Sequence, residues 1–281
     1  MSMSKGFAAL LLCAPATLAW AGSGKLQETA GVTQIEGSSG GGLVPWATLA
    51  GYDSRDETSA SVFATRVSTD DYRLFSWGAA FGWNDRVELS ATHQTFDLTE
   101  TAFEISQNVI GAKVRVYGDV IYSAWPQVSV GAQYKELLDT TLAEAVGAED
   151  FDNGTDFYVA ATKAHLGAFF GYNLVWDLTL RGTKANQFGL LGFGGDQNDS
   201  YEIMGEGSLA VLLSRSFALG VEYRQKPDNL GFAEEEDAAD IFLAYIPNKQ
   251  FNLTVAWVDL GSIAGSDKQT GPYVSLTGYL W

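Results

Sequence analysis

Apolar and polar residues alternate along most of the chain, in runs of about ten residues separated by turn-forming residues. Residues 173–181 show the pattern clearly: Leu, Trp, Leu and Leu occupy the even positions, and Asp, Thr and Arg occupy the odd positions from 177 onward. Residues 127–135, 217–226 and 251–257 alternate in the same way. Because successive side chains of a strand point to opposite faces, each predicted strand has one apolar face and one polar face.

This periodicity predicts an all-β protein with up to fourteen strands, near residues 26–36, 43–52, 58–68, 72–82, 86–96, 107–117, 127–137, 156–166, 172–183, 201–213, 217–226, 238–247, 250–260 and 272–281. The first pair is rich in glycine, and its absence would leave twelve strands. A transmembrane antiparallel β-barrel of 12–14 strands has this pattern, with its apolar faces toward lipid. A soluble β-sandwich also alternates, so further features must decide between the two folds.

The lengths of the connections favour the barrel. Short links are predicted at residues 53–57, 83–85, 214–216 and 248–249, and long ones at 97–106, 138–155, 184–200, 227–237 and 261–271. If the C-terminus lies in the periplasm, all these short links fall on the periplasmic side and all these long ones fall outside. Outer-membrane barrels combine short periplasmic turns with longer exterior loops.

The end of the chain also favours an outer-membrane barrel. Residues 272–281 alternate, and Trp281 is the terminal residue, with Tyr279 two positions before it. This end resembles the C-terminal assembly signal of Gram-negative outer-membrane barrels, which implies recognition by the barrel assembly machinery; Ser275 and Thr277 depart from the usual apolar residues. Aromatic residues near predicted periplasmic strand ends fit a membrane-interface girdle: Trp83, Trp125, Tyr172, Phe217, Tyr245, Phe251, Tyr279 and Trp281.

The first 21 residues have the features of a secretory signal peptide. Lys5 precedes an apolar stretch that ends in Ala-Trp-Ala at residues 19–21, which predicts cleavage before Gly22. Residues 22–281 would then form the outer-membrane barrel. The apolar stretch is too short for a membrane helix, and no later run is long enough. Since about four residues separate the expected cleavage site from the first predicted strand, no long N-terminal plug is expected.

Composition narrows the class of protein. The chain has 34 acidic and 17 basic residues and a formal charge of −17, which argues against binding to nucleic acid, because phosphate contacts need clustered basic residues. The single cysteine, Cys13, excludes a disulfide scaffold and a cysteine-based metal site. The partners expected are outer-membrane lipid, lipopolysaccharide and small polar solutes, and no cofactor is expected.

Four segments near the N-terminus, at residues 24–26, 32–37, 40–46 and 55–57, carry a resemblance to a known family. They resemble a family of uncharacterised proteobacterial outer-membrane proteins, classed as a domain of unknown function, along the whole expected mature length. The resemblance implies the barrel fold and a location in the Gram-negative outer membrane. It implies no substrate and no catalytic residue.

The predicted lumen is charged. Twelve side chains are predicted to line a pore: Arg86, Glu88, Lys113, Arg115, Gln133, Lys135, Asp177, Arg181, Glu202, Glu206, Glu222 and Arg224. The strands up to residue 137 supply a mainly basic wall, and the later strands supply a mainly acidic one. Facing charges of this kind select among solutes, which predicts a passive, porin-like channel for small polar or charged solutes. The alternative is a closed barrel in which the charges pair, and which serves envelope structure or surface contact through its acidic exterior loops.

Neither an enzyme nor a metal site is expected. The two histidines, His93 and His165, lack the serine two positions later that outer-membrane phospholipases and deacylases share, although Thr95 stays open as a nucleophile. Residues 150–156 resemble a calcium loop, but Gly154 stands one position early and no Glu follows at the required place. A solvated acidic loop explains this segment better, and catalytic and metal-binding residues are both predicted to be absent.

Overall fold

A computed structural model describes residues 25–98, 104–150, 152–266 and 268–280 of the chain. The expected signal peptide, residues 1–21, and the terminal Trp281 lie outside the described residues. Within the described part, no helix is both long enough and apolar enough to cross a membrane.

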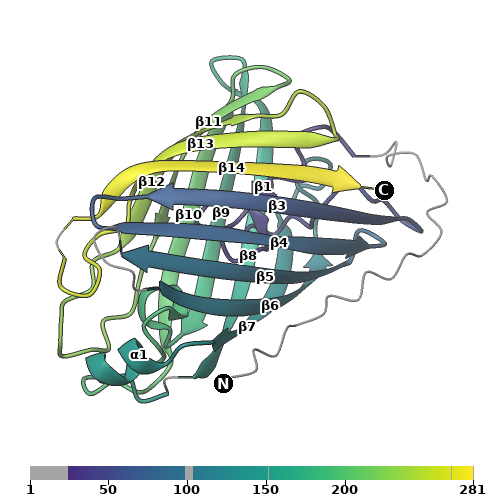
Figure 1. Cartoon of the computed structure of the whole chain (residues 1–281). Coiled ribbons are helices and arrows are strands. Elements are labelled where there is room, and N and C mark those ends of the chain that lie inside the picture. Colours follow the sequence, from purple (N-terminus) through teal and green to yellow (C-terminus); the bar gives the residue numbers. More distant parts are fainter. Residues whose placement is uncertain (1–24, 99–103, 151, 267, 281) are drawn as a thin grey trace, which may run out of the picture.

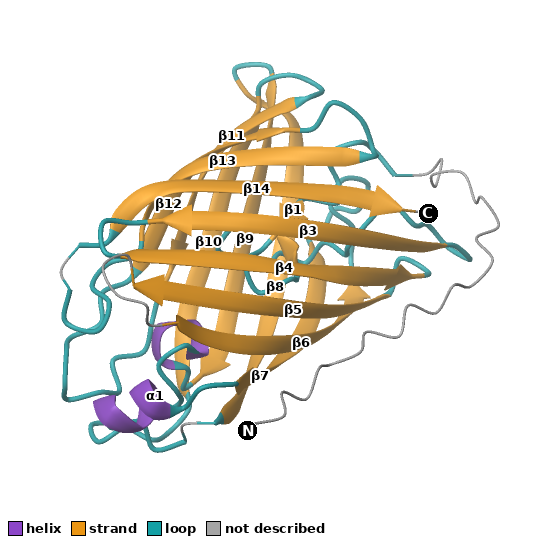
Figure 2. Ribbon diagram, viewed as in Figure 1, coloured by secondary structure: helices purple, strands orange, loops and turns teal. Residues whose placement is uncertain are grey.

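Twelve antiparallel strands form one closed barrel (Figures 1 and 2). They are β3 (Thr58–Ser68), β4 (Tyr72–Trp83), β5 (Val87–Leu98), β6 (Glu104–Tyr117), β7 (Gln127–Leu137), β8 (Asn153–Phe169), β9 (Tyr172–Thr183), β10 (Glu202–Leu212), β11 (Phe217–Arg224), β12 (Ala238–Tyr245), β13 (Phe251–Asp259) and β14 (Thr270–Leu280). Each strand pairs with its neighbours in sequence, and β14 pairs with β3 to close the sheet. The all-β barrel prediction is confirmed, with twelve strands rather than fourteen.

The apolar faces of the strands point outward, which excludes a sandwich with a buried apolar core. On β9, Leu178 and Leu180 are 64% and 60% exposed, whereas Asp177 and Arg181 between and beside them are each 1% exposed. A surface of this kind is stable only against lipid, because exposed apolar side chains in water are costly. The barrel therefore has a lipid-facing exterior and an interior rich in polar side chains, which also holds a buried apolar cluster that includes Phe96, Ile105 and Tyr273.

The segment before β3 differs from the prediction. Residues 30–53, called the inner segment below, are buried throughout and lie inside the barrel instead of forming two wall strands (Figure 1). Their only regular structure is a two-stranded sheet of β1 (Val32–Thr33) and β2 (Ser39–Gly40). The expectation that no N-terminal plug exists is therefore wrong.

Glycine explains why this segment does not continue the wall. A Cβ atom on Gly41 would lie 1.7 Å from a carboxylate oxygen of Glu222, and one on Gly40 would lie 2.4 Å from the Val44 carbonyl oxygen. Six glycines in residues 30–53 allow such close approaches but supply no side chains for a lipid-facing stripe. The segment therefore packs as irregular chain against polar partners inside the barrel.

The connections separate by length, as predicted. One end carries the C-terminal end of β14 and the links at residues 84–86, 170–171, 213–216 and 246–250, and the other carries the loops at 138–152, 184–201, 225–237 and 260–269 (Figure 2). The end with short turns is assigned to the periplasm. Two connections depart from the pattern: 118–126 is a longer periplasmic link and 69–71 is a short exterior one.

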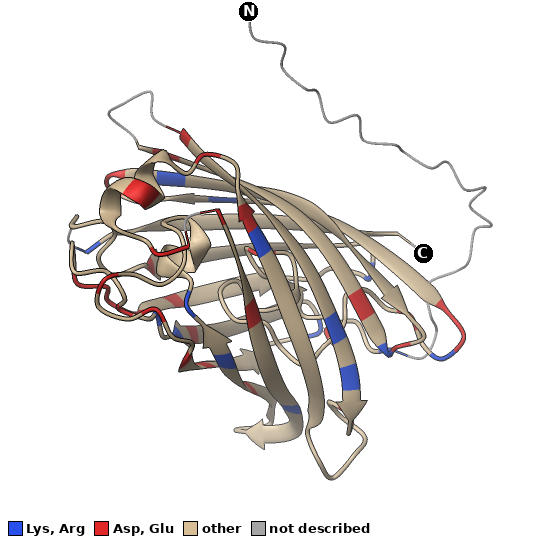
Figure 3. Cartoon of the chain, turned by 90° about the horizontal axis from the view of Figure 1, so that it is seen from below, with Lys and Arg blue, Asp and Glu red and all other residues tan. Residues whose placement is uncertain are grey.

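Short helices stand only in the exterior loops of the described chain. α1 (Thr141–Val146) lies in the loop after β7, and the 3-10 turn η1 (Asn186–Gly189) lies in the loop after β9. Figure 3 shows Asp and Glu residues along the loops at this exterior end. The residues from 185 to 193 are buried, so this loop folds inward over the exterior end of the lumen.

Candidate functional site

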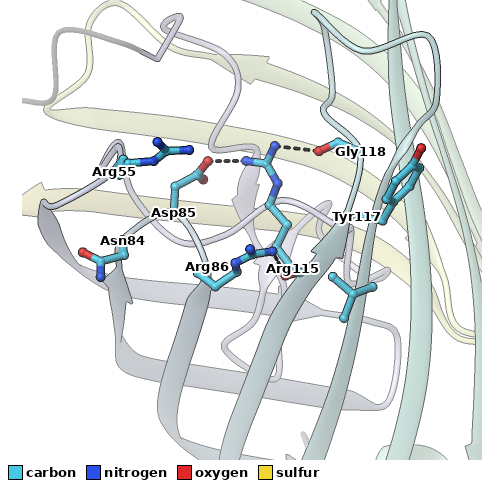
Figure 4. A pocket seen from close by; sticks show the side chains of 8 residues that line it. Arg55, Asn84, Asp85, Arg86, Arg115, Tyr117 and Gly118 are labelled. Carbon is cyan, nitrogen blue, oxygen red and sulfur yellow. Dashed lines mark hydrogen bonds and ion pairs between the residues drawn. The ribbon is translucent and has the colours of Figure 1, made fainter.

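Most of the predicted pore-lining residues face the interior of the barrel. Nine of the twelve are buried on the inward face: Glu88, Lys113, Gln133, Lys135, Asp177, Arg181, Glu206, Glu222 and Arg224. Glu202 is half-buried near the exterior end, where it accepts a hydrogen bond from Asn198 at 2.7 Å. Arg86 and Arg115 lie at the periplasmic rim, outside the lumen (Figure 4).

Many of the buried charges of the wall are paired, whereas Asp177 and Glu222 form no ion pair within 4.0 Å among the described residues. Lys113 pairs with Glu88 at 3.3 Å, and Lys135 pairs with Asp156 at 2.8 Å. Arg181 contacts Asp156 at 3.2 Å and also pairs with Glu206. Neighbouring strands place opposite charges within contact distance, so the predicted basic and acidic walls are not separate in the folded barrel.

Glu36 of the inner segment completes this network and was not predicted as a site residue. Its carboxylate pairs with Arg224 at 2.7 Å and with Lys135, and all three side chains are buried. Arg224 also reaches Glu206 at 3.4 Å. The inner segment therefore supplies a negative charge where the wall presents two cations. An isolated acidic residue in a stretch rich in glycine and serine is the one signal that could have identified it.

Wall side chains also satisfy the backbone of the inner segment. Glu88 accepts hydrogen bonds from the backbone N–H groups of Ser39 and Ala50, at 3.2 and 2.7 Å. Glu222 accepts one from the N–H of Leu43 at 2.8 Å. Lys113 donates to the carbonyl oxygens of Ser39 and Thr48, at 2.8 and 2.7 Å. Buried irregular backbone needs such partners, because unpaired N–H and C=O groups cost free energy.

Neutral polar side chains continue these contacts round the barrel. Gln127 and Ser129 of β7 both donate to the carbonyl oxygen of Ala47 at 2.6 Å. On other strands, the hydroxyls of Thr277 and Thr33 lie 3.0 Å apart, and the indole of Trp46 donates to Ser208 at 2.9 Å. The interface between the inner segment and the wall is therefore polar on several sides of the lumen.

The exterior loop that contains η1 covers the exterior end of the lumen. The carbonyl oxygen of Phe188 accepts hydrogen bonds from Lys135 at 2.9 Å and from Gln107 at 3.3 Å. The guanidinium of Arg224 lies 4.3 Å from the centre of the Phe188 ring, a cation–π contact. The same wall cations that bind Glu36 from one side therefore hold this loop from the other.

A buried ion pair links three exterior loops above this point. Lys226 pairs with Glu235 at 2.9 Å and donates to the side chain of Gln187 and the carbonyl oxygen of Leu260, both at 2.8 Å. Burial lowers the pKa of Lys226 and raises the pKa of Glu235, and each charge opposes the shift of the other.

The inner segment enters and leaves the barrel at the periplasmic end. Just before it, Lys25 pairs with Asp85 of the β4–β5 turn at 2.8 Å, and Gln27 donates to the carbonyl oxygen of Arg215 in the β10–β11 turn. After it, only residues 54–57 precede β3, which starts at this end. Small cavities of about 180, 50 and 30 Å³ remain between the segment and the wall near this mouth.

These features can be compared with known proteins. A family model described as "Protein of unknown function (DUF3034)" matches residues 29–277. The chain belongs to this family. No curated protein sequence matches the chain. The predicted membership of an uncharacterised outer-membrane family is confirmed, and the DUF3034 match covers both the inner segment and nearly the whole barrel wall.

Solved structures of outer-membrane barrels share the fold of this DUF3034 protein. The NanC porin superposes with a TM-score of 0.50 at 11% identity, over 78% of this chain and 98% of that one. The KdgM porin gives 0.48 at 9% identity, over 78% and 98%. Outer membrane phospholipase A from Escherichia coli gives 0.40 at 11% identity, over 83% and 94%. At these identities the likeness shows the fold alone, a closed antiparallel β-barrel like that of the NanC porin.

The two histidines of the DUF3034 chain lie on the outer surface of the barrel. Nδ1 of His93 is 2.9 Å from the amide oxygen of Asn108, and Nε2 of His165 accepts a hydrogen bond from the indole of Trp176 at 3.0 Å. The described residues contain no cluster of three or more metal-ligating side chains, and Asp150 of the expected acidic loop pairs with Lys184 at 2.6 Å. The absence of enzymatic activity and of a metal site stays a prediction.

Glu28, beside the periplasmic mouth, is expected to make the packing of the inner segment in the lumen sensitive to pH. Burial raises its pKa to about 7 from an ordinary value of 4.5, and one carboxylate oxygen has no hydrogen-bond partner. The Glu28 carboxylate therefore binds a proton more tightly when the inner segment is packed in the lumen than when the segment is released from it. This packing is therefore favoured below about pH 4.5 and weakens as the pH rises to about 7.

We expect hydrogen exchange in residues 30–53, corrected for the intrinsic effect of pH, to be faster at pH 8 than at pH 5. In Glu28→Gln this difference should shrink, because the side chain no longer titrates. If hydrogen exchange depended on pH equally in the parent protein and in Glu28→Gln, the pH dependence would not come from Glu28.

Proposed function

We propose that this DUF3034 protein is an outer-membrane channel for small polar or charged solutes, which the inner segment holds closed. The observation that supports this proposal is the chemistry of the interface. Beside apolar contacts of Ile35, Leu43 and Trp46, the wall meets the inner segment through many ion pairs and hydrogen bonds, including those of Glu36 and Lys113. Water and polar solutes can replace such contacts when the segment leaves, because a polar wall stays solvated.

The path of the chain makes withdrawal feasible. Both ends of the inner segment lie at the periplasmic mouth, close to Asp85 and to the start of β3. The segment can therefore leave as a loop, without threading one end through the barrel. Opening also requires the exterior loop around Phe188 to move, and that loop is held by the cations Lys135 and Arg224, which the departure of Glu36 would release on one side.

A reversible cross-link tests whether the segment is the gate. Thr33 of the inner segment and Thr277 of β14 have hydroxyl oxygens 3.0 Å apart, which suits a Thr33→Cys/Thr277→Cys disulfide in a Cys13→Ser background. In planar bilayers we expect ion-selective openings from the reduced protein and none from the oxidised protein, with openings restored by reductant.

A cross-link within the wall is the matched control. Thr65 of β3 and Ser275 of β14 have hydroxyl oxygens 2.7 Å apart, so Thr65→Cys/Ser275→Cys joins two wall strands and leaves the inner segment free. Its oxidation should leave the openings unchanged. Openings that persist in fully oxidised Thr33→Cys/Thr277→Cys would show that the segment is not the gate. A folded, heat-modifiable protein that is silent even when reduced would favour a closed barrel that serves structure or surface contact.

A further inference from the structure

A cleft of about 410 Å³ opens at the periplasmic rim and is lined by three arginines from separate elements (Figure 4). Arg55 comes from the link between the inner segment and β3, Arg86 from the β4–β5 turn, and Arg115 from the end of β6. In Figure 4 the side chains of Arg55 and Arg115 stand on either side of Asp85, and Arg86 lies beside Arg115. The cleft thus gathers positive charge on a chain whose formal charge is −17.

The three arginines differ in how they are paired. Arg115 pairs with Asp85, pairs with Asp119 at 3.1 Å and donates to the carbonyl oxygen of Gly118 at 2.6 Å, so its guanidinium is fixed at the back of the cleft. Arg86 donates to the carbonyl oxygen of Arg115 at 3.1 Å. Among the described residues, neither Arg86 nor Arg55 forms an ion pair within 4.0 Å. Two guanidiniums therefore line the cleft without a carboxylate partner.

The loop beside the cleft holds Arg115 in place. Asp119 accepts hydrogen bonds from the backbone N–H groups of Ile121 and Tyr122, at 2.8 and 2.7 Å. Burial acts to raise the pKa of Asp119, but these N–H groups and Arg115 lower it below its ordinary value. The carboxylate stays ionised at neutral pH, and Arg115 keeps its position whether or not a ligand is present.

We propose that this cleft binds a small multivalent oxyanion, a solute that bears phosphate or carboxylate groups. Guanidinium groups bind such oxygens through parallel N–H donors, and Arg55 and Arg86, which both line the cleft, form no ion pair among the described residues. The volume of the cleft, about 410 Å³, lies at the lower end of the range of small-molecule pockets. This site lies outside the lumen and does not depend on the channel function.

Calorimetric titration of the refolded protein at low ionic strength tests the site, with inorganic phosphate and citrate as separate probes and chloride as the background anion. Arg55→Gln/Arg86→Gln removes the two unpaired guanidiniums. Arg66→Gln/Arg73→Gln is the matched control, because it removes two exposed arginines on β3 and β4 with the same change of net charge. We expect saturable binding of at least one probe by the parent and the control, weakened at least tenfold in Arg55→Gln/Arg86→Gln.

The two probes separate the possible ligand groups. Binding of phosphate alone would narrow the class to phosphorylated solutes, and binding of citrate alone would narrow it to polycarboxylates. Absence of saturable binding by both probes, or equal weakening in the two double variants, would overturn the proposal. The titration is repeated on oxidised Thr33→Cys/Thr277→Cys, in which the lumen is locked. Binding there, with or without channel activity in the reduced protein, separates this site from the proposed function.

Discussion

Glu36→Gln is expected to increase the open probability of the channel by roughly tenfold to a hundredfold. The substitution removes the negative charge that pairs with Arg224 and Lys135 and leaves the shape of the side chain nearly unchanged. Hydrogen bonds to charged groups contribute about 1.5–3 kcal/mol each, and 1.4 kcal/mol is a factor of ten in an equilibrium constant. The wall cations keep Asp156 and Glu206 as partners, so the barrel itself should remain folded.

Single-channel recording of Glu36→Gln, beside Glu104→Gln, measures this effect. Glu104 is exposed at the start of β6, so its replacement changes the net charge equally and touches no lumenal contact. Similar open probabilities for Glu36→Gln and the parent protein would mean that the ion pairs of Glu36 do not hold the segment in the lumen.

Arg181→Leu is expected to destabilise the barrel wall by about 3 kcal/mol or more. The guanidinium of Arg181 is buried, pairs with Glu206 and Asp156, and donates to the side chain of Gln133 at 2.7 Å. Removal of one member of a buried ionic network typically costs 3–5 kcal/mol, because charges are left without a partner in a low-dielectric site. The free energy of unfolding is measured by urea titration in detergent, with heat-modifiability on gels as the check of folding.

Arg66→Leu serves as the reference for this stability measurement. Arg66 lies exposed on the outer face of β3, and its one hydrogen bond in the described structure reaches Ser68 at 3.5 Å. Surface substitutions of this kind change stability by about 0.5 kcal/mol or less. If the two variants lost equal stability, the buried network around Arg181 would contribute no more than an exposed arginine.

The strand alternation predicts the direction of most wall side chains, because the two-residue period of a strand is a local property. It does not predict which charges meet. Lys135 reaches Asp156 although the residue directly opposite Asp156 is Gln133, so the contact is diagonal and depends on the register of β7 and β8. Register is fixed by turns, bulges and closure of the whole sheet, and the sequence pattern of one strand does not contain it.

Arg86 and Arg115 lie at the rim rather than in the lumen because of local features at the strand ends. Arg86 precedes β5, which begins at Val87, so its side chain belongs to a turn. Arg115 stands at an irregularity between β6 and β7, where the register shifts between Arg115 and Tyr117. A bulge re-aims the side chains beside it, and alternation then no longer gives their direction. The strand pattern also predicts wall strands at residues 26–36 and 43–52, but it does not distinguish a wall strand from chain that packs inside the lumen.

The seam of the barrel sets the order in which the protein can be built. β3 follows the inner segment after four residues and is the strand to which β14, the last to be synthesised, must pair. While that seam is open, residues 30–53 can pack against a sheet that has not yet closed. The ionic groups of the wall can then find their partners before the tube seals. The inner segment can thus act as a core around which the sheet closes, and an empty barrel need never form during assembly.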